Sequence, residues 1–196
     1  MEHELFWRGG VFLTLFALFA GLEALVPRRL RALTRTQRWS TNLAITLLNT
    51  VALRGLAVLL PLLAIGAALD ARAQDWGLLN QLDWPGWLEL VPAVLILDLA
   101  IWAQHLVTHK VRVFWRFHRV HHADRDMDVT TGFRFHPVEM LASMGLKIGL
   151  VYLLGPSALA VLVFEILLSG TALFNHSNLA LPGPVDRVLR LVLQRS

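Results

Sequence analysis

Histidine is the residue type through which this sequence could do chemistry. The 196 residues include eight histidines, and six of them fall between residues 105 and 136. Neutral imidazole is the commonest metal ligand in proteins and suits iron, copper, zinc and nickel. The chain contains no cysteine, which excludes a thiolate zinc site, an iron–sulfur cluster and a cysteine nucleophile. Any metal would therefore be bound by histidine or carboxylate side chains.

The spacing of five histidines adds to their number. His105 and His109 are four residues apart, so both rings would leave the same face of a helix. The next group is spaced i, i+3, i+4 and comprises His118, His121 and His122. Two such faces packed together would present five imidazoles to a common centre, which predicts a metal site.

Three further residues are candidates for the same site, each with a plainer alternative. Asp98 lies seven residues before His105, and a carboxylate at membrane depth marks a functional site by default. It would orient a ligating ring or bind the metal directly, or else form a structural hydrogen bond within the helix bundle. His136, directly before Pro137, is either a ligand or a turn residue. His176, after the last apolar segment, is either a ligand or a structural residue.

Two charged residues near these histidines have open roles. Arg134 would pair with an aspartate of the preceding loop or remain solvated, and Glu165 would reach the site or form an interhelical hydrogen bond. The loop aspartates are Asp124, Asp126 and Asp128.

Long apolar segments must position these residues. Hydrophobic residues make up 56% of the chain and charged residues 16%, whereas a soluble domain carries roughly 45–50% and 25%. The apolar stretches cover residues 5–26, 43–69, 88–107 and 138–174. We expect a kink or a split at Pro61 in the second stretch and a hairpin divided at Gly155 in the last. A span needs roughly 20 residues, so we expect an all-α integral membrane protein with about four to five transmembrane helices and a cytosolic histidine-rich helical cap.

Loop charges predict the orientation of these helices. Residues 28–42 carry five arginines and no acidic residue, whereas residues 70–89 carry four acidic residues and one arginine. The positive-inside rule places the first loop in the cytoplasm. Counting spans forward then places the basic segment 109–137, with its histidines, on the same side. In so apolar a chain the net charge of +4 marks a membrane side, and no nucleic-acid partner is expected.

Taken together, the histidine motifs resemble the fatty acid hydroxylase/sterol desaturase superfamily. The matching text is His105-x3-His109, His118-x2-His121-His122, Arg134-x-His136-Pro137 and Phe174-x-His176-x-Asn178, with Asp98 ahead of the first motif. Order and spacing together are a strong signal of this superfamily over residues 90–186, and the motif around His136 resembles that of the sterol-desaturase-like branch. We accordingly divide the chain into an N-terminal transmembrane region, residues 1–87, and a hydroxylase-like catalytic region, residues 88–196.

The resemblance implies a membrane oxygenase with a histidine-bound dimetal centre on the cytosolic face. It implies two iron ions, with zinc as a substitute, and O2 as co-substrate. Electrons would come from NAD(P)H through a cytochrome b5 or a ferredoxin with its reductase. The reaction would hydroxylate or desaturate a C–H bond of a sterol or fatty-acyl lipid in lipid biosynthesis. The implied metal ligands are His105, His109, His118, His121, His122, His136 and His176, with Asp98 as the expected catalytic carboxylate.

One departure from the family pattern is visible. A third H-x2-H-H motif is expected downstream of His176, and the sequence reaches Ser196 without it. We therefore expect a fragment, a truncated and catalytically incomplete member, or a site completed in another way. A different class of function is a non-enzymatic membrane protein that binds metal or haem. A zinc hydrolase fits less well, because H-E-x-x-H is absent.

Overall fold

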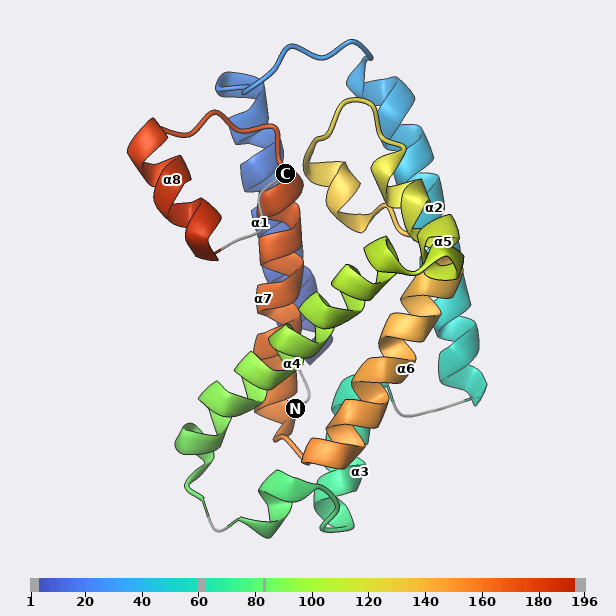
Figure 1. The fold of residues 1–196 in the computed structure, drawn as a ribbon, viewed down its shortest axis with the longest axis vertical. Coiled ribbons are helices and arrows are strands. Elements are labelled where there is room, and N and C mark those ends of the chain that lie inside the picture. The colour runs from blue at the N-terminus through green and yellow to red at the C-terminus, as the bar shows by residue number, and fades with distance from the viewer. Residues whose placement is uncertain (1–3, 60–62, 83, 193–196) are drawn as a thin grey trace. The chain divides into compact units, whose positions relative to one another are not determined.

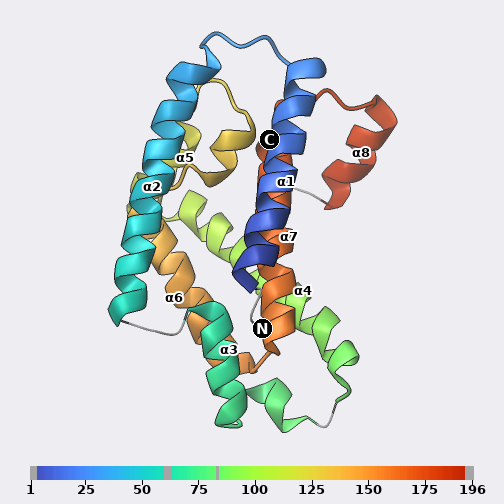
Figure 2. The same ribbon diagram turned by 180° about the vertical axis from the view of Figure 1, so that it is seen from behind.

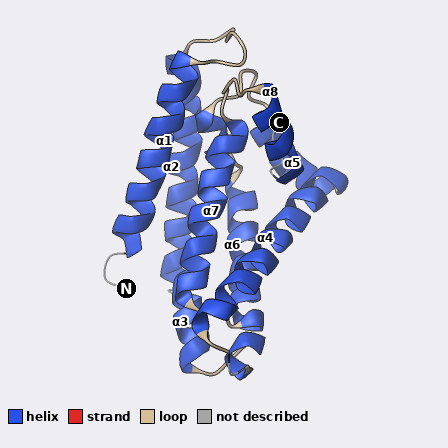
Figure 3. Ribbon diagram, turned by 90° about the vertical axis from the view of Figure 1, so that its left-hand side faces the viewer, coloured by secondary structure: helices blue, strands red, loops and turns tan. Residues whose placement is uncertain are grey.

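The chain folds into helices joined by loops. A computed structural model describes residues 4–59, 63–82 and 84–192, and over these residues Figure 3 shows helices and no strand. The α-helices are α1 (Glu4–Leu25), α2 (Arg35–Leu59), α3 (Ala64–Ala73), α4 (Gly86–Lys110), α5 (Arg112–His122), α6 (Pro137–Leu154), α7 (Ala158–His176) and α8 (Gly183–Val192). Two short 3-10 helices are η1 (Leu78–Gln81) and η2 (Val129–Phe133). The predicted all-α class is confirmed.

Four of these helices are long and apolar enough to cross a membrane. They are α1 over Phe6–Leu25, α4, α6 and α7. Each leaves large apolar side chains exposed, among them Leu13, Leu95 and Leu167. Lipid tails would cover such a surface, whereas water would leave it as an unusually large apolar patch. The prediction of a multi-span membrane protein is therefore confirmed.

The apolar stretch over residues 43–69 is not one helix. Most of it belongs to α2, and its end belongs to α3, a separate helix of 10 residues. Neither helix is among the four that could span a membrane, and Pro61 lies outside the described residues. The predicted orientation requires a crossing between residues 28–42 and 70–89, and this crossing stays a prediction.

The chain divides into two compact units, of which the first comprises residues 4–47, 120–134 and 166–192. Within it, α1 lies beside the C-terminal part of α7 (Figure 2). Ala20, Val129 and Leu173 are buried between these elements and η2. The rings of Phe16 and Phe133, with centroids 5.9 Å apart, pack against them. Burial of this apolar surface stabilises the unit and holds the 120–134 segment against α1 and α7.

The close fit of η2 on α7 depends on a glycine and a cap. A Cβ on Gly132 would lie 2.9 Å from the carbonyl oxygen of Ala172, so a larger residue would push the two elements apart. Asp128 caps η2, because its carboxylate accepts from the backbone N–H of Thr130 at 2.9 Å. In return, the hydroxyl of Thr131 accepts from the backbone N–H of Asp128.

The second unit comprises residues 48–119 and 135–165. In it, α3 packs against α6 (Figure 1), and the hydroxyl of Tyr152 donates to the carboxylate of Asp70 at 2.8 Å. The predicted break at Gly155 is confirmed, since this residue ends α6 in the left-handed conformation with φ of 67°. The predicted boundary at residues 87/88 stays a prediction.

Glu165 forms an ion pair between helices. Its carboxylate lies 2.9 Å from the ammonium group of Lys147, and both side chains are largely buried. A charge at membrane depth is costly unless it is paired, so each of these two residues stabilises the other. The pair also joins α6 to the first half of α7. Of the two predicted roles of Glu165, the interhelical one is observed.

Candidate metal centre

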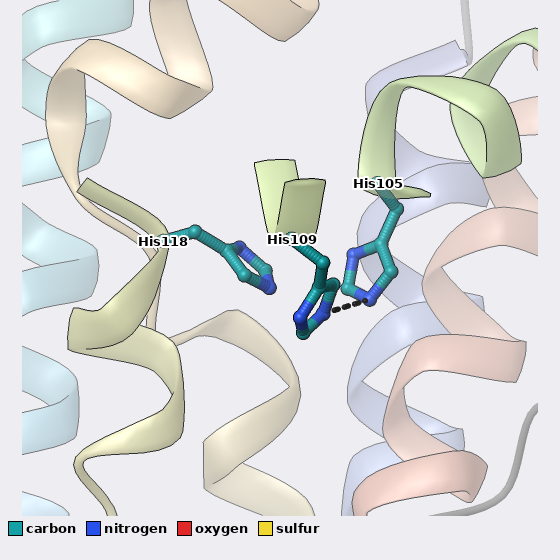
Figure 4. A group of neighbouring side chains, drawn as sticks. All are labelled: His105, His109 and His118. Atoms are coloured by element: carbon teal, nitrogen blue, oxygen red, sulfur yellow. Dashed lines mark hydrogen bonds between the residues drawn. The ribbon is translucent and has the colours of Figure 1, made fainter. Parts of the chain in front are cut away.

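Three of the predicted ligands come together in the second unit. His105 and His109 lie one turn apart near the end of α4, and His118 lies on α5. Their ligand nitrogens are all within 4.8 Å of one another, and the three rings converge in Figure 4. His118 is fully buried, His105 is half-buried and His109 is exposed. Three imidazoles that meet at one point form a donor set that fits a metal ion.

Glu139 orients His118 and was missed from the sequence. Nδ1 of His118 lies 2.7 Å from Oε1 of Glu139, an oxygen that accepts, so we assign the hydrogen to Nδ1. The lone pair of His118 is then on Nε2, the atom available to a metal. Oε2 of Glu139 is buried and has no hydrogen-bond partner among the described residues. One feature of the sequence pointed to Glu139: it is an acidic residue in the first turn of an apolar helix, three residues after His136.

His121 and His176 meet in the first unit. Their Nε2 atoms are 2.8 Å apart and their rings are nearly perpendicular, at 83°. Nδ1 of His176 lies 2.7 Å from the carbonyl oxygen of Ala172, and Nδ1 of His121 lies 3.3 Å from that of Arg134. A carbonyl oxygen only accepts, so each Nδ1 carries the hydrogen and each Nε2 presents a lone pair. Two facing lone pairs repel unless they share a cation or a proton, so this pair also fits a metal ion.

One distance within each group agrees with two imidazoles that bind the same ion. A metal–imidazole bond is roughly 2.0–2.1 Å long, so two such bonds at about 90–110° place their nitrogens about 2.9–3.4 Å apart. The Nε2 atoms of His105 and His109 are 3.2 Å apart, within this range. Those of His121 and His176 are 2.8 Å apart, just below it. Imidazole and carboxylate donors without thiolate suit iron and zinc.

Two other predicted site residues are His122, which lies beside His121, and Asp98 on α4. His122 is exposed on α5, and its ring centroid is 5.2 Å from that of His121. Asp98 is exposed on α4, and no hydrogen bond joins its carboxylate to a histidine in the part of the chain that the structure describes. Their roles as ligand and catalytic carboxylate stay predictions. The gathering of five imidazoles at one centre also stays a prediction.

His136 has a structural contact besides its predicted role as a ligand. It is the N-cap of α6, where its Nδ1 accepts from the backbone N–H of Val138 at 3.1 Å. Its ring packs against Phe117, with centroids 5.0 Å apart. Because Nδ1 accepts, the hydrogen of the neutral ring lies on Nε2, so in this tautomer neither nitrogen presents a free lone pair to a metal. The role of His136 as a ligand stays a prediction.

A buried ionic network holds the loop that follows α5 in the first unit. The guanidinium group of Arg38, on α2, bonds Asp124 at 2.8 and 2.9 Å and Asp128 at 2.7 Å. Burial alone would raise the pKa of Asp124, but hydrogen bonds from its neighbours, Arg38 first among them, lower that pKa to about 2. Burial alone would lower the pKa of Arg38, and the two carboxylates raise it instead. Asp124 and Arg38 therefore stay ionised at neutral pH.

Arg134 does not pair with the loop aspartates. Its Nη1 donates to the side-chain oxygen of Asn42 at 2.8 Å, and its Nε donates to the carbonyl oxygen of Val120 at 2.9 Å. Arg38 pairs with Asp124 and Asp128 instead, because α2 places its guanidinium group against the loop. Arg134 thereby ties α2 to the end of α5 while its own carbonyl oxygen faces His121. The sequence missed Arg38 and Asn42 as partners of this segment.

Comparison with known proteins decides the family. The fatty acid hydroxylase family model matches residues 90–195, the region that holds every histidine described above. The chain belongs to the fatty acid hydroxylase family. The resemblance expected from the motifs is thus confirmed. Ornithine lipid hydroxylase OlsE of Rhizobium tropici is 25% identical over 191 residues, which are 95% of this chain and 57% of that relative.

The chain thus spans little more than half the length of this family relative. No solved structure matches it significantly.

Proposed function

We propose that this chain is the membrane-embedded part of a metal-dependent lipid hydroxylase, an oxidoreductase that introduces oxygen from O2 at a C–H bond of a membrane lipid. Family membership and the name of the relative, a hydroxylase of ornithine lipid, support this class of reaction and substrate. One observation carries the proposal. The Nε2 atoms of His121 and His176 face each other at 2.8 Å while backbone carbonyls hold both Nδ1 atoms, an arrangement that a metal ion bound by both Nε2 atoms would satisfy.

The proposed metal is iron, with one ion for each histidine group. One ion would be held by His105, His109 and His118, and the other by His121 and His176. When bound, iron supplies the activation of O2 and the oxidation of an unactivated C–H bond. Glu139 would keep His118 in the ligating tautomer and could add a carboxylate oxygen.

The surrounding residues would position the substrate and limit access of water. His118 and His121 are buried, so their donor atoms are shielded from bulk solvent. His105, His109 and His176 lie near the ends of the candidate spans α4 and α7, where a lipid tail in the bilayer would reach them. We further propose that the basic segment, residues 109–137, is cytoplasmic. This segment would attract an acidic electron donor, a cytochrome b5 or a ferredoxin.

Metal analysis joined to a lipid assay tests the proposal. The chain is expressed with iron available, purified in detergent, and its metal content per chain is measured by inductively coupled plasma mass spectrometry. We expect close to two irons, and with a reductant and O2 a gain of one oxygen atom by ornithine lipid or a fatty-acyl phospholipid. Loss of two hydrogens would make the enzyme a desaturase. A chain that binds no metal, or that shows a haem Soret band, would contradict the proposal.

A further inference from the structure

A positively charged hollow lies in the first unit where α1 ends. Its volume is about 280 Å³, and its polar lining is made by Glu23, Arg29, Arg31 and Arg35. Three guanidinium groups thus face one carboxylate. The hollow contains none of the candidate metal ligands, and Leu30 forms part of its rim.

Glu23 cannot neutralise the arginines around it. Its side chain is fully buried, and Oε1 accepts from the backbone N–H groups of Val129 and Asn178, both at 2.7 Å. Oε2 accepts from Nη2 of Arg31 at 2.9 Å and lies 3.6 Å from Nη2 of Arg35. Two carboxylate oxygens that already face four donors have little capacity left for more.

The hollow retains guanidinium donors without acceptors. The Nε atoms of Arg31 and Arg35 are buried and have no hydrogen-bond partner among the described residues. Arg29 bonds through its backbone N–H, and its exposed side chain lines the hollow. Buried guanidinium N–H groups are costly to leave unpaired. Their planar donor geometry matches the oxygens of a phosphate or carboxylate group.

We propose that this hollow binds an anionic group with several oxygens, a phosphate or carboxylate, supplied by a lipid headgroup. The candidate span of α1 ends at Leu25, so the hollow lies where a headgroup layer would be. Leu25 and Leu30 beside it are 79% and 96% exposed, and their side chains would enter the adjoining acyl region. Basic clusters next to spans attract anionic lipids. The site is independent of the metal groups and of the proposed hydroxylation.

Native mass spectrometry of lipid adducts tests this site. The delipidated chain in neutral detergent is titrated with phosphatidylglycerol, which is anionic, and with zwitterionic phosphatidylcholine. In a parallel arm, the midpoint of thermal unfolding is measured with added inorganic phosphate. Two variants probe the hollow: Arg29→Ala removes an exposed side chain, and Arg31→Lys keeps the charge toward Glu23 while removing Nε–H. Arg187→Ala, an exposed arginine of α8 that does not line the hollow, is the matched control.

We expect phosphatidylglycerol to bind at least tenfold more tightly than phosphatidylcholine. Arg29→Ala and Arg31→Lys should each weaken this binding about tenfold, and Arg187→Ala should not. If inorganic phosphate stabilises the chain with the same dependence on the two variants, the anion site is supported with a free anion as its source. Equal binding of both lipids without stabilisation by phosphate, or variants that bind like the unchanged protein, would overturn the proposal.

Discussion

The Nε2 atoms of His121 and His176 lie 2.8 Å apart, although 55 residues separate the two histidines in the chain. Nδ1 of His121 is held by the carbonyl oxygen of Arg134, and Nδ1 of His176 by that of Ala172. Backbone carbonyls cannot rotate away as side chains can, so both lone pairs are aimed before any ion binds. A site arranged in this way loses little conformational freedom on binding a metal.

The first prediction concerns metal content. His121→Ala should remove about one of two metal ions per chain, because His176 alone is a weak ligand. His118→Ala should remove the other, because it takes away the buried member of the group in the second unit. Metal per chain is measured by mass spectrometry, with His3→Ala, outside every predicted motif, as the control. Unchanged metal in both variants would exclude these histidines as ligands.

The second prediction tests whether Glu139 contributes to metal binding through its contact with His118. Glu139→Gln leaves an oxygen that can accept from His118 but removes the charge, so metal affinity should fall about tenfold or more. Competition with a coloured chelator measures the affinity. Glu165→Gln is the matched control, because it neutralises a carboxylate that pairs with Lys147. If both variants lose affinity equally, Glu139 has no specific link to the metal.

The third prediction concerns the ionic network of the first unit. Asp124→Asn leaves the buried Arg38 with one carboxylate partner, so the folded state should lose about 3 kcal/mol at neutral pH. The pKa of Asp124 is lowered from 3.8 to about 2 in the folded protein. Its stabilising contribution is therefore full above about pH 4 and is lost as the pH falls toward 2.

Thermal unfolding in detergent between pH 7 and pH 2 measures this contribution. The difference in unfolding midpoint between Asp124→Asn and the unchanged protein should shrink on acidification. Asp126→Asn is the control, since Asp126 accepts at an exposed position from the backbone N–H of Leu33. A difference that stays constant with pH would show that the ionisation of Asp124 does not stabilise the fold.

Local patterns in the sequence were enough to predict the four candidate membrane spans and the shared helix face of His105 and His109. The apolar stretches gave α1, α4 and the hairpin broken at Gly155, and the i, i+4 spacing of His105 and His109 gave neighbouring rings. Helical periodicity reports which residues share a face of one element. It carries no information about which distant element that face meets.

The residues that were missed depend on contacts between distant segments. Arg38 meets Asp124 across 86 residues, and Asn42 meets Arg134 across 92. An arginine in a basic loop gives no sign that it is buried, and Arg134 was a nearer candidate for the aspartates. Glu139 was missed for the same reason, since only the fold shows that its carboxylate faces His118.

The fourth prediction concerns the turn that separates α6 from α7. Gly155 has φ of 67°, and a Cβ there would lie 2.5 Å from the backbone oxygen of Trp76. A residue with a side chain pays roughly 1–2 kcal/mol in this left-handed conformation, and the contact with a backbone atom adds to that cost. Gly155→Ala should therefore lower the unfolding midpoint clearly. Gly149→Ala within α6 is the control, because nothing lies within 4 Å of its Cβ position and alanine favours a helix. Equal midpoints for the two variants would show that the turn tolerates displacement of the 76–80 segment. A lower midpoint for Gly155→Ala alone would show that this glycine is needed for the hairpin to pack against that segment.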